Sequence, residues 1–232
     1  MIEMAMVLLI VALLLGGGLT VFSAQIEQQK FKDTQKALDE AKEALIGYAA
    51  SHGSPGNPYL PCPDRTVGLG ANDGAEDRVA GAGTNCVVLE GNLPWVSLGL
   101  TGLDGWSNRI RYRVSQQALV TGFNTGTVGA LTVNNAAGAN LATNIPVVLV
   151  SHGPNGWGAI SSSGNPIGNP PAANVNETEN TGVVANAVYV ANPPVAAGLA
   201  GGEFDDIVTW LPFSLILNRM LQAGVCVKVV CP

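Results

Sequence analysis

The sequence has few charged residues, and acidic residues outnumber basic ones. Charged residues make up 12% of the 232 residues, and 11 Lys and Arg against 17 Asp and Glu give a net charge of −6. Proteins that bind DNA or RNA are usually basic, because neutralisation of phosphates supplies most of their affinity. We therefore expect no nucleic acid as the main partner.

The chain also lacks the motifs of common catalytic sites. It contains no Gly-x-Ser-x-Gly elbow, no complete phosphate-binding loop and no His-Glu-x-x-His. Its two histidines, His52 and His152, both occur in Ser-His-Gly, where we expect turns. No Cys-x-x-Cys spacing supports a zinc site. These absences predict that the protein is not an enzyme and needs no cofactor.

No lysine or arginine precedes Lys30, and a long apolar run occupies this part of the chain. Residues 4–22 contain one polar side chain, Thr20, and could span a bilayer or be buried among copies of themselves. The carboxylate of Glu3, just before the run, needs a cationic partner. Because Lys30 would lie about 40 Å away along a helix, that partner must be a terminal amine, a lipid group or another chain.

Three interpretations of this run stay open. A cleaved secretory signal would need a positive start, which is missing here, and small residues before the cut. A plain membrane anchor is the second interpretation. The third is a helix that first spans the membrane and later packs against the same helix of other copies of the chain.

Residues 25–50 predict an amphipathic continuation of this helix. One face carries apolar or small residues at heptad spacing: Phe31, Thr34, Leu38, Ala41, Leu45 and Tyr48. The opposite face offers the ion pairs Lys36–Glu40 and Asp39–Lys42. Prolines and glycines in residues 51–58 end the helix. The three glycines Gly16, Gly17 and Gly18 predict that it stretches or melts near residues 16–20; close packing between helices through small residues is the alternative.

The remainder is rich in Gly, Ala, Asn, Thr, Ser and Val, a composition that suits short strands, turns and long loops. We predict strands at residues 109–114, 127–133, 146–151 and 185–190, and an exposed loop at residues 161–180. Pro212 and Gly224 bracket a short, mostly buried helix. In the first strand Arg109, Arg111 and Arg113 form a basic face, which we interpret as solvated. Contact with acidic groups of a neighbouring chain is the alternative, and DNA binding is a minor option.

If the apolar run anchors the chain with the remainder outside the cell, its four cysteines favour disulfides. We favour the pairs Cys62–Cys86 and Cys226–Cys231 among the three possible pairings. The second pair conflicts with a straight strand, which would hold its Cα atoms about 16 Å apart, whereas a disulfide needs less than about 7 Å. Asp73, Glu76 and Asp77 are weak candidates for calcium ligands, and a solvated acidic turn is the preferred interpretation.

The start Met1-Ile2-Glu3-Met4, followed by the apolar run, resembles type IV pilins and type II secretion pseudopilins. In that family an acidic residue precedes about twenty apolar residues, and Glu3 matches it. The basic leader of the family and its glycine are absent, so we expect a processed or trimmed chain. Within the family, Leu-Pro-Cys-Pro, Leu-Pro-Trp, Asp-x-Trp-x-Asn-Arg-x-Arg-Tyr and Ser-His-Gly resemble a subgroup with larger heads.

The resemblance implies an α+β pilin fold: a long N-terminal helical stalk packed on an antiparallel β-sheet head with long loops and a short C-terminal helix. The expected parts are a hydrophobic stalk (residues 1–24), an amphipathic half (25–52) and the head (53–232). The assembly residues would be those of the stalk, with Glu3 paired to a neighbour's terminal amine: Met1, Glu3, Met4, Leu8, Val11, Leu15, Gly16, Gly17, Gly18 and Phe22.

The resemblance also implies a function. The chain would lie in the inner membrane as a precursor, meet the assembly machinery there, and then join identical subunits in an extracellular helical filament. The outer surface of the filament could bind a ligand on a surface or on a host. A minor pilin or a secretion pseudopilin is the second interpretation. A monomeric membrane-anchored binding module or enzyme is the alternative from another class.

Overall fold

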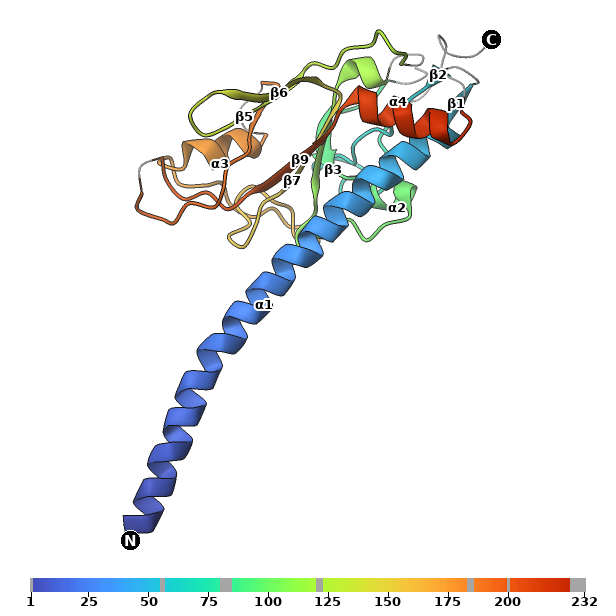
Figure 1. Ribbon diagram of the computed structural model, residues 1–232. Coiled ribbons are helices and arrows are strands. Elements are labelled where there is room, and N and C mark those ends of the chain that lie inside the picture. The colour runs from blue at the N-terminus through green and yellow to red at the C-terminus, as the bar shows by residue number, and fades with distance from the viewer. Residues whose placement is uncertain are drawn as a thin grey trace.

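The computed structural model describes residues 2–54, 57–79, 85–119, 123–182, 186–199 and 201–225, with the backbone alone for residues 2–3, 8–22 and 53–54. One long helix, α1 (Ile2–Ser51), carries a β-rich head on its C-terminal half, and its N-terminal end lies far from the head (Figure 1). The fold class is α+β with an antiparallel sheet, as predicted.

Helix α1 continues without a break through residues 16–20. The predicted stretching or melting at this point is therefore wrong for the single chain. Each glycine costs only about 1 kcal/mol relative to alanine, and breaking the helix would give up backbone hydrogen bonds on both sides of the break. The residues that flank the glycines include many good helix formers and no proline.

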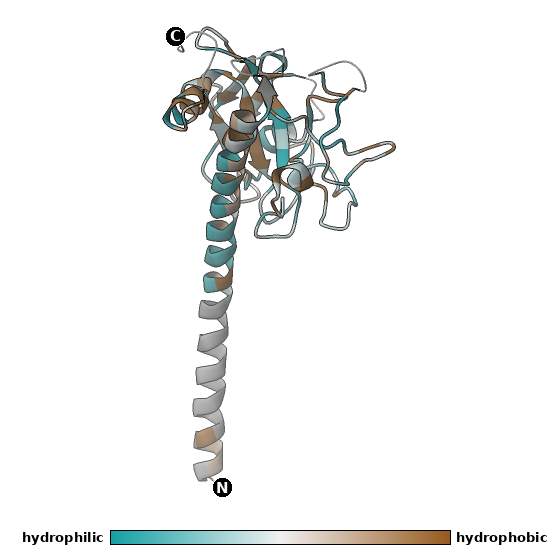
Figure 2. Cartoon of the chain, turned by 90° about the vertical axis from the view of Figure 1, so that its right-hand side faces the viewer, coloured by the Kyte–Doolittle hydropathy of each residue, from teal (hydrophilic) through white to brown (hydrophobic). Residues whose placement is uncertain are grey.

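The C-terminal half of α1 buries the face that the heptad spacing predicted. Of the predicted face, Thr34, Leu38, Ala41, Leu45 and Tyr48 are buried and Phe31 is half-buried; Ile46 and Ala49 are buried as well. On the other side Lys36 and Glu40 lie 3.6 Å apart and Lys42 and Asp39 lie 2.7 Å apart. Hydrophilic residues accordingly dominate the outer side of α1 next to the head (Figure 2). The helix ends at Ser51, as the following glycines and prolines predicted.

A four-stranded antiparallel sheet with the order β3-β4-β7-β9 forms the centre of the head. Its strands are β3 (Glu90–Asn92), β4 (Arg111–Val114), β7 (Val147–Ser151) and β9 (Ile207–Leu211). Tyr112 pairs with Leu149, and both lie in the core cluster that also holds Leu38 and Leu45 of α1. One face of this sheet is therefore packed on the stalk helix.

A second sheet covers the other face of the first. It has the order β6-β5-β8, built from β5 (Leu131–Asn134), β6 (Asn140–Ile145) and β8 (Val188–Val190), with β5 and β8 parallel. Val148 and Val150 of β7 belong to its core cluster, whereas Val147 and Leu149 belong to that of α1. Both faces of β7 are thus buried, and all five of its residues are inaccessible.

Helix α4 (Phe213–Gln222) packs beside the end of α1, and its C-terminal Gly224 has a φ of +73°. Pro212 and Gly224 therefore bracket a short helix as predicted. The smaller elements are β1 (Gly53–Ser54) and β2 (Asn57–Pro58), which pair with each other, α2 (Trp95–Leu98) and a 3₁₀ turn (Gln116–Ala118).

The four predicted strands correspond to β4, β5, β7 and β8, each shifted or shortened at an end, and Ala185 lies outside the described residues. Strands β3, β6 and β9 and the two-residue strands β1 and β2 were not predicted. The exposed loop predicted for residues 161–180 is wrong in its last part, because α3 (Val175–Asn180) lies there and buries Glu177 and Asn180. Polar contacts hold this helix, which explains why its low apolar content was misleading.

Cys62 and Cys86 form the predicted disulfide, with their Cα atoms 5.3 Å apart. The other predicted pair, Cys226 and Cys231, lies outside the described residues. Among the residues with described side chains, no helix has a run that is long and apolar enough to cross a membrane. Most of the apolar run at residues 4–22 is outside that search.

Candidate functional site

Most of the residues predicted to drive assembly lie beyond what the structure describes. Met1 is not described, and side chains are not described for the others in the stalk: Glu3, Leu8, Val11, Leu15, Gly16, Gly17, Gly18 and Phe22. Met4 is described and is 78% exposed, and its neighbours Met6 and Val7 are 66% and 60% exposed. Large apolar side chains at the N-terminal end of α1 are therefore exposed in the single chain.

The weak calcium candidates do not converge on one point. Glu76 accepts a hydrogen bond from the Tyr48 hydroxyl and pairs with Arg78 at 2.9 Å. Asp77 pairs with Arg65 at 2.6 Å. Asp73 instead accepts a hydrogen bond from the backbone amide of Ala75. Since arginines neutralise two of the three carboxylates, this loop offers no cation site, and the acidic turn is largely paired rather than solvated.

The basic face of β4 is not solvated either. Arg111 and Arg113 both pair with Glu90 of β3, at 3.2 and 3.3 Å. The guanidinium of Arg109 lies 3.6 Å from the ring centroid of Trp95 and donates to backbone carbonyls of Thr101 and Ser162. The prediction of a solvated face was wrong, because the head supplies its own acidic and aromatic partners for these side chains.

His152 is a core residue rather than the expected turn residue. It is fully buried after β7, and Arg111 Nε donates to its Nε2 at 3.1 Å. Since arginine can only donate, Nε2 must be the unprotonated nitrogen. Nδ1 therefore carries the proton and faces Asp206 Oδ1 at 3.4 Å. His52, by contrast, is exposed and stacks on Tyr48 with ring centroids 3.8 Å apart.

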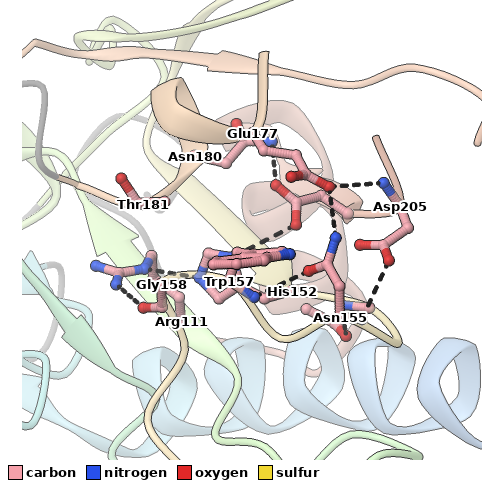
Figure 3. A network of polar contacts seen from close by, with 12 residues as sticks. Arg111, His152, Asn155, Trp157, Gly158, Glu177, Asn180, Thr181 and Asp205 are labelled. Atoms are coloured by element: carbon pink, nitrogen blue, oxygen red, sulfur yellow. Dashed lines mark hydrogen bonds and ion pairs between the residues drawn. The ribbon is translucent and has the colours of Figure 1, made fainter. Parts of the chain in front are cut away.

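Behind His152 lies an acidic cluster of Glu177, Asp205 and Asp206, whose carboxylate oxygens come within 4.8 Å of one another. Glu177 comes from α3, and the two aspartates directly precede β9. Figure 3 shows Glu177 and Asp205 converging with His152 and Asn155 from segments that are distant in the sequence. Among the described residues this is the group whose acidic oxygens meet in the interior.

Amide groups hold each carboxylate of the cluster in place. Asn155 Nδ2 donates to Glu177 Oε1 at 2.8 Å, and the Asn155 backbone amide donates to Asp205 Oδ2 at 3.1 Å. Asn180 Nδ2 donates to Asp206 Oδ2 at 2.8 Å. These donors engage one oxygen of each aspartate, Asp205 Oδ2 and Asp206 Oδ2.

The remaining aspartate oxygens have unsatisfied lone pairs. Asp205 Oδ1 and Asp206 Oδ1 are inaccessible to solvent, and neither accepts a well-aligned hydrogen bond from a described group, although His152 Nδ1 lies 3.4 Å from Asp206 Oδ1. Burial raises the pKa of Asp205 to about 7, and the charges of Glu177, Asp206 and Glu203 add to the rise. Neighbouring buried carboxylates that all ionise repel one another unless a cation or a proton compensates them.

The donor set suits a hard divalent cation. The ligand atoms are all carboxylate oxygens, which Ca²⁺ and Mg²⁺ prefer. The hydrogen bonds from Asn155 and Asn180 already orient these carboxylates. Glu177, Asp205 and Asp206 are the residues that would hold the ion, with His152 and Arg111 behind Asp206. The sequence offered one signal for this site, the adjacent Asp205 and Asp206, but gave no indication that Glu177 lies beside them.

Asp64, next to the disulfide, is a second buried carboxylate. It is fully buried; Asn92 Nδ2 donates to its Oδ2 at 3.3 Å, and its Oδ1 accepts no hydrogen bond from a described group. Burial raises the pKa of Asp64 to about 6, partly offset by the hydrogen bonds from Asn92 and Gly74. The folded protein therefore holds the proton on Asp64 more tightly than the unfolded chain does.

We expect Asp64→Asn to stabilise the protein at pH 7 but not at pH 4. Because the folded pKa lies above the unfolded value of 3.8, the stability that the proton contributes is lost as the pH rises from about 4 through about 6. Each pKa unit is worth about 1.4 kcal/mol before solvent screening, so we expect a gain of about 1 kcal/mol. Urea unfolding at both pH values measures it, and an equal gain at pH 4 would contradict the explanation.

Comparisons with protein-family models, with curated proteins and with solved structures found no match for this chain. Its function is therefore inferred from its own residues and their geometry.

Proposed function

We propose that this protein is a structural subunit that polymerises through its N-terminal helix into an extracellular filament like a type IV pilus. The observation that carries the proposal is the single helix α1, 50 residues long, of which only the C-terminal half is covered by the head (Figure 1). A free rod that begins with the residue pattern of a pilin stalk is the arrangement that filament assembly needs.

The exposed apolar side chains on this rod supply the cohesion. Met4, Met6, Val7 and Ile26 are each more than half exposed in the single chain. Burying a large apolar side chain contributes about 1.5–3 kcal/mol. With the rest of the apolar run at residues 4–22, packing of parallel stalks would release enough free energy to hold a filament together.

The architecture of the head supports the finer assignment to a pilin fold. In this chain the amphipathic half of the helix packs on one face of an antiparallel sheet, and a disulfide closes a loop beside it. The packing of the helix on the sheet matches the arrangement that the sequence resemblance implies. We propose that the precursor is anchored in the inner membrane before assembly and that the head forms the outer surface of the filament.

The test is to isolate surface filaments and identify their subunits. If the protein is a major subunit, mass spectrometry of sheared filaments should find this chain as the dominant component, and a strain without it should lack them. If the protein is a minor pilin or a pseudopilin, this chain should make up only a small fraction of the filaments. If it is a membrane-anchored enzyme or binding module, the filaments should not contain this chain, and that result would refute the proposal.

A second proposed function is the binding of a divalent cation by the head. The two buried aspartate oxygens without a well-aligned hydrogen bond, beside Glu177, favour it. The ion would join α3 to the start of β9, because Glu177 and Asp205 lie 28 positions apart in the sequence. Its expected effect on stability is given in the Discussion.

A further inference from the structure

The loop of residues 104–108, Asp-Gly-Trp-Ser-Asn, lies against about two turns of α1, residues 27–34. Trp106 Nε1 donates to Glu27 Oε1 at 3.1 Å, and the Trp106 ring meets the Phe31 ring edge to face at 4.9 Å. The backbone amide of Gly105 donates to Thr34 Oγ1 at 2.9 Å, and Thr34 is fully buried. Three different kinds of contact therefore join this loop to residues 27–34 of the helix.

Gly105 is the point of closest approach. A Cβ atom added at this position would lie 2.3 Å from the backbone oxygen of Lys30 and 2.8 Å from its Cα. No side chain fits there without moving the loop or the helix, so the loop backbone packs directly on the helix backbone. A glycine with this requirement indicates a specific junction rather than a chance contact.

The loop is rigidly fixed to the centre of the head. Asp104 Oδ1 accepts hydrogen bonds from the backbone amides of Trp106 and Asn108, both at 2.9 Å. Its Oδ2 accepts from the Ser151 hydroxyl at 2.7 Å, and Ser151 is the last residue of the central strand β7. A pairing between Leu103 and Arg109 closes the base of the loop. The position of Trp106 is thus tied to the sheet.

This junction coincides with the point where the stalk leaves the head. Residues 23–26, immediately before it, are all exposed, and so are Met4, Met6 and Val7 further along. From Thr34 onward the inner face of α1 is buried at regular intervals. The direction of the free rod is therefore set where residues 27–34 are held, because a helix transmits its orientation stiffly over a few turns.

We propose that residues 104–108 form a stalk clamp that fixes the direction in which α1 leaves the head. Glu27, Trp106 and Gly105 are its positioning residues. Holding the rod at one angle to the head fixes how far apart the heads of neighbouring subunits stand. This consequence for assembly rests on the proposed function, whereas the clamp itself does not.

Hydrogen exchange of the full chain in detergent micelles tests the clamp. Gly105→Ala should force the loop away from Lys30, and Trp106→Ala should remove both side-chain contacts. For each variant we expect the amides of residues 27–34 to exchange about tenfold faster, because the segment loses its tertiary contacts. The amides of residues 38–45, deep in the core, should keep their protection.

Matched variants separate the clamp from general destabilisation. Glu27→Gln keeps an oxygen acceptor for Trp106 and should retain most of the protection. Gly168→Ala adds a methyl group where nothing lies within 4 Å and should change nothing. Unchanged exchange at residues 27–34 in both clamp variants, or equal acceleration at residues 38–45, would overturn the proposal.

The consequence for assembly has its own readout. In filaments of Trp106→Ala the helical rise or twist should differ from that of the wild type, whereas filaments of Gly168→Ala should keep the wild-type values. Unchanged rise and twist in Trp106→Ala would refute the effect on head spacing. If the wild-type protein forms no filament at all, the proposed function fails, and the exchange experiment still decides whether the clamp exists.

Discussion

Replacing Glu3 with alanine should nearly abolish filaments while leaving the folded head intact. On the proposed function, the Glu3 carboxylate pairs with the terminal amine of a neighbouring subunit inside an apolar core. Leaving one charge of such a pair without its partner costs about 3–5 kcal/mol. Since about 1.4 kcal/mol is tenfold in an equilibrium constant, we expect the number of filaments to fall by about a hundredfold or more. Electron microscopy of sheared surface material, with immunoblots of the subunit in cells, provides the measurement.

The matched control removes a carboxylate from the same helix. Glu40 pairs with Lys36 on the outer side of α1, and its side chain is 55% exposed. An exposed pair of this kind contributes less than about 1 kcal/mol, so Glu40→Gln should assemble almost normally. Glu3→Asp, which keeps the charge on a shorter side chain, should restore part of the assembly. Normal filaments from Glu3→Ala at equal subunit levels would show that charge pairing at this position is not needed.

Removing divalent cations should lower the thermal stability of the head. A ligand that binds only the folded state at about 100 times its dissociation constant stabilises it by about 2.7 kcal/mol. For a chain of this size that corresponds to about 5–10 °C in Tm. We therefore expect millimolar Ca²⁺ to raise the Tm by this amount relative to a sample with chelator. The effect should be larger at pH 8 than at pH 5, because protons compete for carboxylate ligands.

Two substitutions assign this effect to the acidic cluster. Asp206→Asn keeps the size of the side chain and removes a ligand charge, so its Tm should no longer respond to Ca²⁺. Asp39→Asn, at an exposed position on α1, should respond like the wild type. A Tm that is identical with Ca²⁺ and with chelator in the wild type would mean that a proton on Asp205, not a cation, compensates the cluster.

The features that the sequence predicted well are those that depend on local periodicity. The heptad spacing of Leu38 and Leu45 identified the buried face of α1, because burial on a helix follows its 3.6-residue period. Pro212 and Gly224 located α4 through backbone preferences that do not depend on the rest of the fold. The loop composition around Cys62 and Cys86 also pointed to the disulfide.

The candidate site could not be predicted because long-range contacts build it. Glu177 lies in a segment with few apolar residues, which is typical of an exposed loop. The segment is instead a short helix whose polar side chains turn inward, with Asn180 bonded to Asp206 and to the backbone of Val190. His152 looked like a turn residue because its partners Arg111 and Asp206 lie 41 and 54 positions away.

The same limit explains the other errors. β6 alternates poorly between exposed and buried residues, so no period of two marks it as a strand. The arginines of β4 do alternate, and the strand was predicted correctly. Their environment was not, because Glu90 becomes their neighbour only when β3 pairs with β4.

Cryo-electron microscopy of sheared surface filaments tests the central claim most directly. We predict filaments built of this chain, with the α1 helices of many subunits packed together along the axis, the apolar run at residues 4–22 buried among them, and the heads outside. Finding the chain only as a monomer, with α1 alone in a lipid bilayer, would contradict the account.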